Sequence, residues 1–268
     1  MSNTVTLRVW GDFACFTRPE MKVERVSYPV PTPSAARGIL EAVFWEPEMY
    51  YLIDSIRVIK RGRWVSFRRN EVNDVIAMTS VRRWIDSPKL ASPIHADDPG
   101  NDGSDGQRRR EAVRAQRTML ALQEVEYLIT AEIHISELGR DGGQLLPKYF
   151  REIKDRARQG KCYHRPALGV RECAADFDWF EGDADAYIRQ HSEPYSEDFG
   201  LMLYDVFDHR NRKNGFRWLR PDEPSGEKLW KGDLVKPQPA FFHAKLEHSV
   251  MDCHPARVEI LSPTTGAS

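Results

Sequence analysis

The chain is short of cysteine. Its 268 residues include 4 cysteines, Cys15, Cys162, Cys173 and Cys253, and no two of them form a C-x-x-C pair. This pattern excludes the disulfide framework of a small secreted domain and fits a reducing compartment. A zinc site built from Cys162, His164 and Cys173 remains one alternative, but we predict a protein with no metal site and no cofactor.

The chain also lacks a long apolar run. No segment approaches the roughly 20 apolar residues that a membrane-spanning helix needs. The first residues, MSNTVTLRVW, lack the basic and apolar regions of a secretory signal. We therefore expect a cytoplasmic protein with no membrane association. A hydrophobic content of 41% is enough for a substantial core, in one elaborate domain or in a domain with a smaller appendage.

Net charge is nearly absent as well, but the charges are segregated. The formal net charge is -1. Basic residues gather at 60–69, 82–83, 108–117 and 148–165, and acidic residues gather at 172–198. Such runs are often ordinary solvated faces. Several basic blocks in one chain nevertheless favour a polyanionic partner.

The first predicted element is a short strand. Val5, Leu7 and Val9 alternate with polar residues, as in a half-buried strand, and Gly11 and Asp12 should end it. A long loop should follow this strand. The sequence therefore predicts a strand, a turn and a loop over its first thirty or so residues.

A capped helix comes next. Thr32 can cap free backbone amides and Pro33 suits the first helical position, while Pro47 should stop the helix. Arg37 and Glu41 lie one turn apart on a second face of the helix. The apolar stripe that should pack on a sheet consists of Ile39, Leu40, Val43 and Phe44.

Two further strands flank a long insertion. Residues 50–60 are rich in β-branched and aromatic residues, which favours a strand. Residues 61–123 have weak periodicity and read as an inserted loop, and its Gly, Asp, Ser and Pro content predicts a mobile stretch at 93–107. Residues 124–136 show the clearest alternation in the chain. We expect this strand to have one core face and one largely polar face.

A second helix and a fourth strand complete the first unit. Pro147 can open the helix, Gly160 can close it, and its apolar stripe should be Phe150, Ile153 and Ala157. Residues 167–173 are short and apolar enough for a strand. The order strand, helix, strand, strand, helix, strand is the ferredoxin-like pattern, so we predict an α+β fold with an RRM-like domain.

The rest of the chain reads as β-structure. Residues 201–207 and 216–219 flank a polar turn containing Asn214 and Gly215, which favours a hairpin. We predict a ferredoxin-like domain at 1–173 with the insertion at about 61–123, and a β-rich, antiparallel C-terminal subdomain at 174–268.

Three blocks of sequence carry a family resemblance. They are WGDFACFTRPE at the first strand and loop, SYPVPTPSAARGILEAVFWEP at the first helix, and LGVREC near residue 170. Together and in this order they resemble the CRISPR-associated repeat-processing RNA endonucleases of type I-C systems, the Dvulg subtype of the fifth Cas family in the RAMP superfamily. The resemblance covers most of the chain.

The resemblance implies a function and a set of partners. It implies metal-independent cleavage of precursor CRISPR RNA at repeat hairpins, after which the protein stays on the 5′ handle of the guide RNA. It also implies membership of the Cascade complex, with its backbone, large and small subunits as partners and target DNA reached through the complex. A non-catalytic scaffold that only binds the handle is the alternative function.

The resemblance implies catalytic positions as well. The family carries a Tyr directly before the Trp that ends the first helix, and a Lys-His pair that opens the second helix. In this chain Phe44 precedes Trp45, and the pair is Lys148 and Tyr149. Lys148 alone is unchanged, so the resemblance carries over only that residue of the catalytic group.

Metal-free RNA cleavage uses the neighbouring 2′-OH as nucleophile and needs a base and a cation near the phosphate. Lys148 suits the charge role, although a solvated lysine is its alternative reading. Tyr149 is a weak base unless Lys148 and Arg151 lower its pKa, and core packing is its alternative. Phe44 has no hydroxyl, so it can only pack or stack on a base.

Histidine is the usual residue for proton transfer near neutral pH. His164 follows the basic helix and is the candidate substitute base, and His134 on the polar face of a strand is the second choice. Either can instead be structural. A metal-dependent nuclease is a third possibility, but no compact cluster of carboxylates and histidines lies on one element.

Arginine forks match phosphate geometry, so arginines are the expected RNA contacts. The stacking signature of an ordinary RRM is absent, which favours recognition by hairpin shape. The candidate RNA-binding residues are Arg25, Arg37, Arg61, Arg63, Arg68, Arg69, Arg108 and Arg151.

Overall fold

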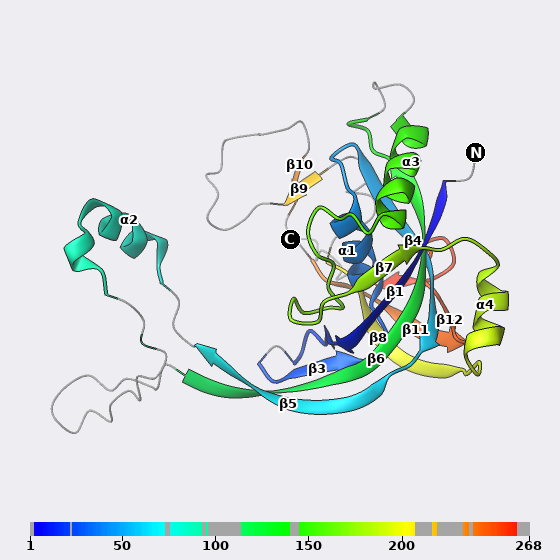
Figure 1. The fold of residues 1–268 in the computed structure, drawn as a ribbon, viewed down its shortest axis with the longest axis horizontal. Coiled ribbons are helices and arrows are strands. Elements are labelled where there is room, and N and C mark those ends of the chain that lie inside the picture. The colour runs from blue at the N-terminus through cyan, green and yellow to red at the C-terminus, as the bar shows by residue number, and fades with distance from the viewer. Residues whose placement is uncertain are drawn as a thin grey trace, which may run out of the picture.

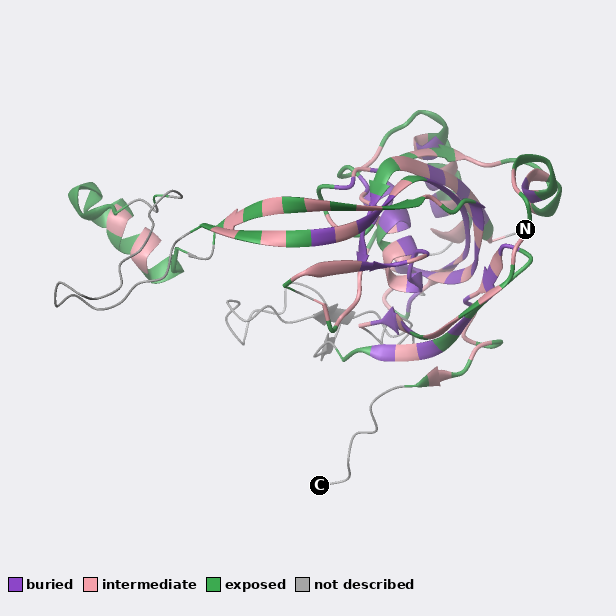
Figure 2. Cartoon of the chain, turned by 90° about the horizontal axis from the view of Figure 1, so that it is seen from below, coloured by how far each residue is buried: buried purple, intermediate pink, exposed green. Residues whose placement is uncertain are grey.

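The structure, a computed structural model, describes residues 3–21, 23–72, 76–92, 95, 114–139, 145–206, 216–218, 233–235 and 238–261. It is a mixed α/β fold with a strongly curled mixed sheet (Figures 1 and 2). The strands are β1 (Thr4–Ala14), β2 (Phe16–Thr17), β3 (Arg25–Tyr28), β4 (Met49–Lys60), β5 (Arg63–Val72), β6 (Arg114–Ile135), β7 (Asp176–Trp179), β8 (Glu197–Asp205), β9 (Phe216–Trp218), β10 (Asp233–Val235), β11 (Ala240–Glu247), β12 (Val250–Asp252) and β13 (Ile260–Leu261). The helices are α1 (Pro33–Val43), α2 (Met78–Asp86), the short 3-10 helix η1 (Pro88–Leu90), α3 (Leu145–Arg158) and α4 (Ala184–His191).

Four strands form the centre of the sheet. They lie in the order β4-β6-β1-β7, and each neighbouring pair is antiparallel. Along the chain the elements follow as β1, α1, β4, β6, α3 and β7, with β5 and α2 inserted between β4 and β6. Beyond β4 the sheet continues through β12, β11 and β13. The predicted positions of both helices and of the strand at 50–60 are therefore confirmed.

The core lies between the sheet and two helices. Val5, Leu7 and Val9 of β1 are fully buried on one face, as their alternation predicts. The helices α1 and α3 cover that face, and the sheet curls around α1 (Figure 2). Apolar burial on this scale is the main stabilising contribution in a domain of this size.

The opposite face of β6 is largely polar, as predicted, but part of it is buried. Leu128 on that face is buried with Ile59 and with Ile188 of α4. The Glu126 carboxylate is also buried there, with Arg8 Nε at 2.7 Å and Lys60 Nζ at 3.3 Å. The amphipathic helix α4 was not expected from the sequence, and its packing explains the burial.

The first and fourth predicted strands need correction. Gly11 and Asp12 do not end β1, which pairs with β6 as far as Ala14. Residues 167–173 form only isolated bridges, and the fourth strand is β7. The reason is a close crossing: a Cβ on Gly169, which has a φ of +90°, would lie 2.0 Å from the Cys15 carbonyl oxygen. Segment 167–173 thus packs on the end of β1 as a glycine turn.

The insertion at 61–123 is more ordered than its weak periodicity predicts. Its first part is β5, which pairs with the N-terminal half of β6 in a long two-stranded arm (Figure 1). The helix α2 lies at the far end of that arm. The stretch predicted to be mobile, 93–107, lies outside the described residues apart from position 95. Arm residues are alternately exposed and half-buried, which hides the usual apolar pattern of a strand.

The predicted C-terminal hairpin is wrong. Strand β8 pairs with β11, and β9 pairs in parallel with β10. The turn at 207–215 lies outside the described residues. Because β12 pairs with β4, the C-terminal strands extend the main sheet, and β7 adds a strand beyond residue 173. The division into domains at that residue stays a prediction.

Among the described residues, no helix combines the length and the apolar character that crossing a membrane requires.

Candidate functional site at the end of helix α1

Helix α1 positions Phe44. The Thr32 hydroxyl accepts a hydrogen bond from Ala35 N at 3.1 Å, and Pro33 occupies the first turn, so the predicted cap is confirmed. At the other end Phe44 N donates to Leu40 O at 3.0 Å, and the backbone then becomes extended. Phe44 is the C-cap residue of the helix, and its buried side chain packs against α3.

Helix α3 presents a buried stripe to α1 that differs from the expected one. The stripe is Tyr149, Ile153 and Ala157, spaced four residues apart. Phe150 is only half-buried and packs edge-on against Trp179 at 5.8 Å between ring centroids. The Tyr149 ring lies 5.7 Å from the Phe44 ring. The two positions that the family resemblance pairs are therefore in contact.

Tyr149 is a poor base in this setting. Its hydroxyl donates to Glu48 Oε2 at 3.3 Å, and burial together with the Glu48 carboxylate raises the pKa of Tyr149 to about 12. Lys148 and Arg151 do not lower this pKa, so the condition under which Tyr149 could act as a base is not met. A phenol with that pKa is ionised in only about one molecule in a hundred thousand at neutral pH. The residue fits the core, with its hydroxyl held by Glu48.

Arg156 is a site residue that the sequence reasoning missed. Its guanidinium lies over the Phe44 ring, with Cζ 5.5 Å from the centroid. Arg156 also approaches Glu152, with Nε and the carboxylate oxygen 3.8 Å apart. Tyr149 and Arg156 are seven residues apart, two helical turns, and so share a face of α3. That spacing is the signal in the sequence that could have found Arg156.

The loop after α3 returns to the end of α1. Gly160 closes the helix at a φ of +63°, as predicted, and Lys161 N then donates to Arg156 O at 2.9 Å. Two further backbone amides, of Tyr163 and His164, donate to the carbonyl of Ala42 at 2.8 and 3.3 Å. Ala42 lies two residues before Phe44. The fold thus brings the exposed His164 close to the Phe44 end of α1.

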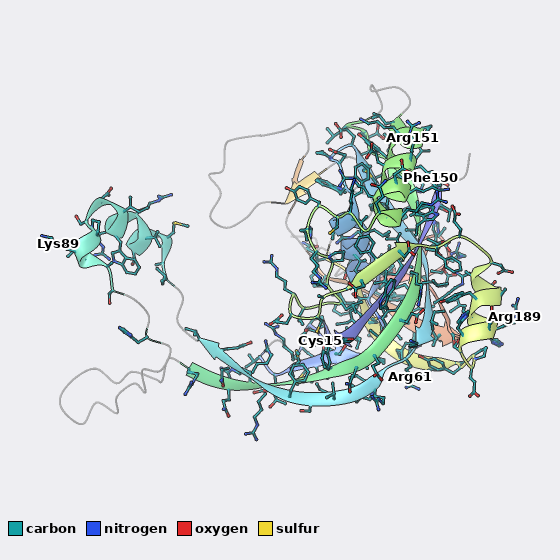
Figure 3. All side chains as sticks on the ribbon, in the orientation of Figure 1. Cys15, Arg61, Lys89, Phe150, Arg151 and Arg189 are labelled. Atoms are coloured by element: carbon teal, nitrogen blue, oxygen red, sulfur yellow. The ribbon has the colours of Figure 1, made fainter. Side chains whose placement is uncertain are left out.

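Lys148 and Arg151 are exposed on α3 and form no ion pair with any described residue. The Lys148 ammonium lies 5.6 Å from the centroid of the Tyr149 ring. Figure 3 shows Arg151 and Phe150 on this helix. The site therefore combines exposed cations on α3, the packed Phe44 and Tyr149 rings, and the loop that carries His164.

The second histidine lies elsewhere. His134 of β6 stacks on Tyr50 at 5.3 Å, and its Nε2 lies 2.8 Å from Glu132 Oε2. These contacts are those of a structural histidine at the sheet surface.

Several candidate RNA-binding arginines are neutralised by the fold. Arg37 is almost fully buried and binds Asp205 through Nε at 3.0 Å, with Glu41 as a second partner. Burial alone would lower the pKa of Arg37, but these two carboxylates raise it above its ordinary value. A guanidinium in this position holds α1 to β8. It is not available to a phosphate.

Arg25 and Arg69 share carboxylate partners in the same way. Arg25 lies 3.7 Å from Glu71 and 3.3 Å from Glu172, and Arg69 lies 2.6 and 3.2 Å from the same two residues. The pKa of Glu172 is lowered by a backbone hydrogen bond and by these arginines. This network joins β3, β5 and the turn at 167–173. Glu172 lies more than a hundred residues from both arginines along the chain, so the sequence gives no sign of these ion pairs.

Three further candidate arginines, Arg61, Arg63 and Arg68, lie on or beside the arm. Arg61 bonds Glu197 at 2.7 Å and lies over the Tyr195 ring, at the opposite end of the sheet from α3 (Figure 3). Arg63 forms an exposed pair with Glu124 at 2.9 Å. Arg68 is exposed, with no ion pair to a described residue. Arg108 lies outside the described residues.

No group of three or more His, Cys, Asp or Glu side chains among the described residues could hold a metal ion. Cys173 is buried, and burial, with a smaller effect from Cys15, raises the pKa of its thiol to about 11. Zinc binds the thiolate, which a raised pKa disfavours. The alternative zinc site from Cys162, His164 and Cys173 is not formed.

Comparison with known proteins identifies the family. The Cas5d family model, described as a CRISPR-associated protein, matches residues 4–254. The CRISPR pre-crRNA endoribonuclease Cas5d of Mannheimia succiniciproducens is 39% identical over 222 residues, which is 81% of this chain and 91% of that protein. Its namesake from Thermus thermophilus is 34% identical over 249 residues, 92% of this chain and 89% of the relative.

Two solved structures share the fold. One, a CRISPR-associated protein, has a TM-score of 0.55 at 19% identity, and the match covers 94% of this chain and 91% of the other chain. The other, a functionally uncharacterized protein from Streptococcus mutans, has a TM-score of 0.57 at 19% identity, covering 98% of each chain. The site at the end of α1 thus lies within a match that spans nearly the whole sequence, and the chain belongs to the Cas5d group of CRISPR-associated proteins.

Proposed function

We propose that this protein is a metal-independent endoribonuclease that cleaves precursor CRISPR RNA at repeat hairpins. The observation that carries the proposal is its 39% and 34% identity to two proteins named as CRISPR pre-crRNA endoribonucleases, over 81% and 92% of the chain. The exposed cations Lys148 and Arg151 on α3 support an anionic substrate at that place.

The proposed reaction uses the 2′-OH beside the scissile phosphate. Its oxygen attacks phosphorus, the bond to the 5′ oxygen breaks, and a cyclic phosphate forms on the upstream fragment. His164 accepts the proton of the 2′-OH, and the leaving oxygen takes a proton from water. Lys148 stabilises the negative charge that develops on the phosphate. Both side chains are exposed and so are accessible to RNA.

Phe44, Tyr149 and Arg156 take other roles in this proposal. Phe44 and Tyr149 pack together and fix the spacing between α1 and α3. Arg156 stands over Phe44 and supplies a second cation for the phosphate. With Tyr149 excluded as base by its raised pKa, the chain needs another proton acceptor, and His164 is the nearest candidate by backbone contact to α1.

The frame of the site is, in this proposal, a ferredoxin-like unit. The antiparallel order β4-β6-β1-β7 with α1 and α3 on one face supports it. The C-terminal strands would then form the β-rich addition beyond residue 173. After cleavage the protein stays in the cytoplasm on the 5′ handle, within a Cascade complex of backbone, large and small subunits that reaches target DNA.

A second function has one observation in its favour. Phe44 has no hydroxyl, and Tyr149 is buried with its hydroxyl on Glu48, so two positions of the implied catalytic group are unsuited to proton transfer. A non-catalytic subunit that binds the handle would need neither. It would bind the repeat hairpin tightly and never cut it.

One experiment separates the two. The purified protein is incubated with its cognate repeat hairpin in EDTA, beside the same RNA carrying a single 2′-deoxy sugar at the cut. We expect one cut in the normal RNA and none in the deoxy RNA. Equal cutting of both would contradict the 2′-OH mechanism. Tight binding with no cut in either RNA would favour the scaffold.

A further inference from the structure

Tyr163 is the most exposed of the large apolar side chains that the structure describes. Its exposed fraction is 85%, against 41% for Trp45 and 48% for Trp64. Among the described residues its ring contact is an edge-on approach to His164, at 5.9 Å between centroids. A ring with this exposed fraction lacks the burial that usually makes an aromatic side chain stabilising. Its position therefore suits a surface that is covered by a ligand.

The backbone around Tyr163 is fixed. Gly160 N donates to Ala157 O at 3.1 Å, Lys161 N donates to Arg156 O, and Tyr163 N donates to Ala42 O at 2.8 Å. The loop is thus attached both to the end of α3 and to the end of α1. A ring on an anchored backbone costs less conformational entropy when it binds than a ring on a free loop.

Two basic residues flank Tyr163 in the sequence, and both are exposed. They are Lys161 and Arg165, and Arg165 is 70% exposed, with a 3.6 Å approach to Asp176. A flat apolar ring between positive groups is complementary to a nucleotide, whose base stacks and whose phosphates carry negative charge. An apolar protein surface would gain nothing from these flanking charges.

We propose that Tyr163 is a stacking platform for one unpaired nucleobase of the RNA, next to the reaction centre. This inference rests on the proposed function, because it gives the substrate a fixed place beside His164. Single-stranded bases are the part of an RNA that proteins read by stacking on aromatic side chains. Tyr163 would hold the strand that flanks the hairpin and so align the phosphate to be cut. It acts as a positioning residue.

The test measures binding, with cleavage blocked by the 2′-deoxy sugar. Dissociation constants are measured for the wild type, Tyr163→Ala and Tyr163→Phe on the repeat hairpin and on hairpins with one abasic site in turn in each flank. We expect Tyr163→Ala to bind about tenfold more weakly and Tyr163→Phe to bind as the wild type. One abasic position should weaken the wild type by the same factor and leave Tyr163→Ala unaffected. Leu201→Ala, which removes another exposed apolar side chain, is the matched control and should change nothing.

Two results would overturn the inference. One is Tyr163→Ala binding within about twofold of the wild type, which is what a protein-docking role would give. The other is a loss of affinity in Tyr163→Ala that adds to the loss caused by each abasic site, so that no abasic position is coupled to Tyr163. Wild-type cleavage of unmodified hairpin is followed in parallel. If the coupling is found but no cleavage occurs, the proposed enzyme function fails and the base site stands. If cleavage occurs without coupling, only the base site fails.

Discussion

Two groups of cations in this protein differ in their partners. Arg37, Arg25 and Arg69 are half-buried or buried and each meets two carboxylates within 4 Å. Lys148 and Arg151, on α3, are exposed and pair with no described carboxylate. The sequence does not separate the two groups, because each arginine of the first group has a carboxylate partner that lies more than a hundred residues away along the chain.

The difference teaches where an anionic ligand can bind. A buried ion pair has its charge already neutralised, and freeing it for a phosphate would leave a carboxylate buried and uncompensated. An exposed cation keeps its charge available. We therefore propose that the paired arginines stabilise the fold and that Lys148 and Arg151 on α3 bind RNA.

The largest effect on stability should come from Arg37→Ala. It leaves Asp205, whose side chain is 8% exposed, without its main partner, which should cost about 3–5 kcal/mol of unfolding free energy. Urea unfolding measures this. The matched control is Arg63→Ala, which breaks an exposed pair and should cost less than about 1 kcal/mol. Equal costs for the two variants, or a large loss of RNA affinity in folded Arg37→Ala, would break the comparison.

His164→Ala should act on cleavage alone. Loss of a general base typically lowers the rate by about a hundredfold or more, and we expect that fall in single-turnover cleavage, with hairpin affinity nearly unchanged. His134→Ala is the control, since its ring is held by Glu132 on the sheet, and it should cleave at the wild-type rate. A His164→Ala protein that cleaves normally would remove His164 from the mechanism.

Tyr149→Phe should have the smallest effect on cleavage. Because the pKa of Tyr149 is about 12, its ionised form does not contribute near neutral pH, and the rate should stay within about threefold of the wild type. A loss of a hundredfold would restore Tyr149 as the base and would count against His164.

The same pKa predicts a change in stability at alkaline pH. Folding raises the pKa of Tyr149 from its ordinary value of about 10 to about 12. The contribution of Tyr149 to the free energy of unfolding is therefore complete below about pH 10 and is lost as the pH rises through about 12. Between about pH 9 and about pH 11 the wild type should lose stability relative to Tyr149→Phe. Parallel urea unfolding of the two proteins measures the difference. A constant difference across this range would contradict the raised pKa.

The sequence predicts the local features of this fold well. The cap at Thr32, the stripe of α1 and the strand at 50–60 depend on neighbouring residues, and all three are confirmed. The prediction of a fourth strand at 167–173 was wrong because that segment crosses close to Cys15, which lies far away along the chain. The helix α4 was not predicted from the sequence for a similar reason, since its packing partner Leu128 lies on another element.

The site was predictable only in part. Phe44 and Tyr149 were paired through the family resemblance, and their contact follows from the packing of two amphipathic helices. The neutralised arginines were not foreseen, because Arg37 and Asp205 are 168 residues apart. Charge pairing over that distance is a property of the fold. No pattern of neighbouring residues encodes it.

The most direct test of the account is single-turnover cleavage by Lys148→Ala at saturating protein. If Lys148 stabilises the phosphate, the rate should fall by about a hundred- to a thousandfold. Hairpin affinity should change little, with the salt slope of binding reduced by about 0.7 at most. Cleavage by Lys148→Ala at the wild-type rate, with binding intact, would contradict the claim that the reaction centre lies at the end of α1.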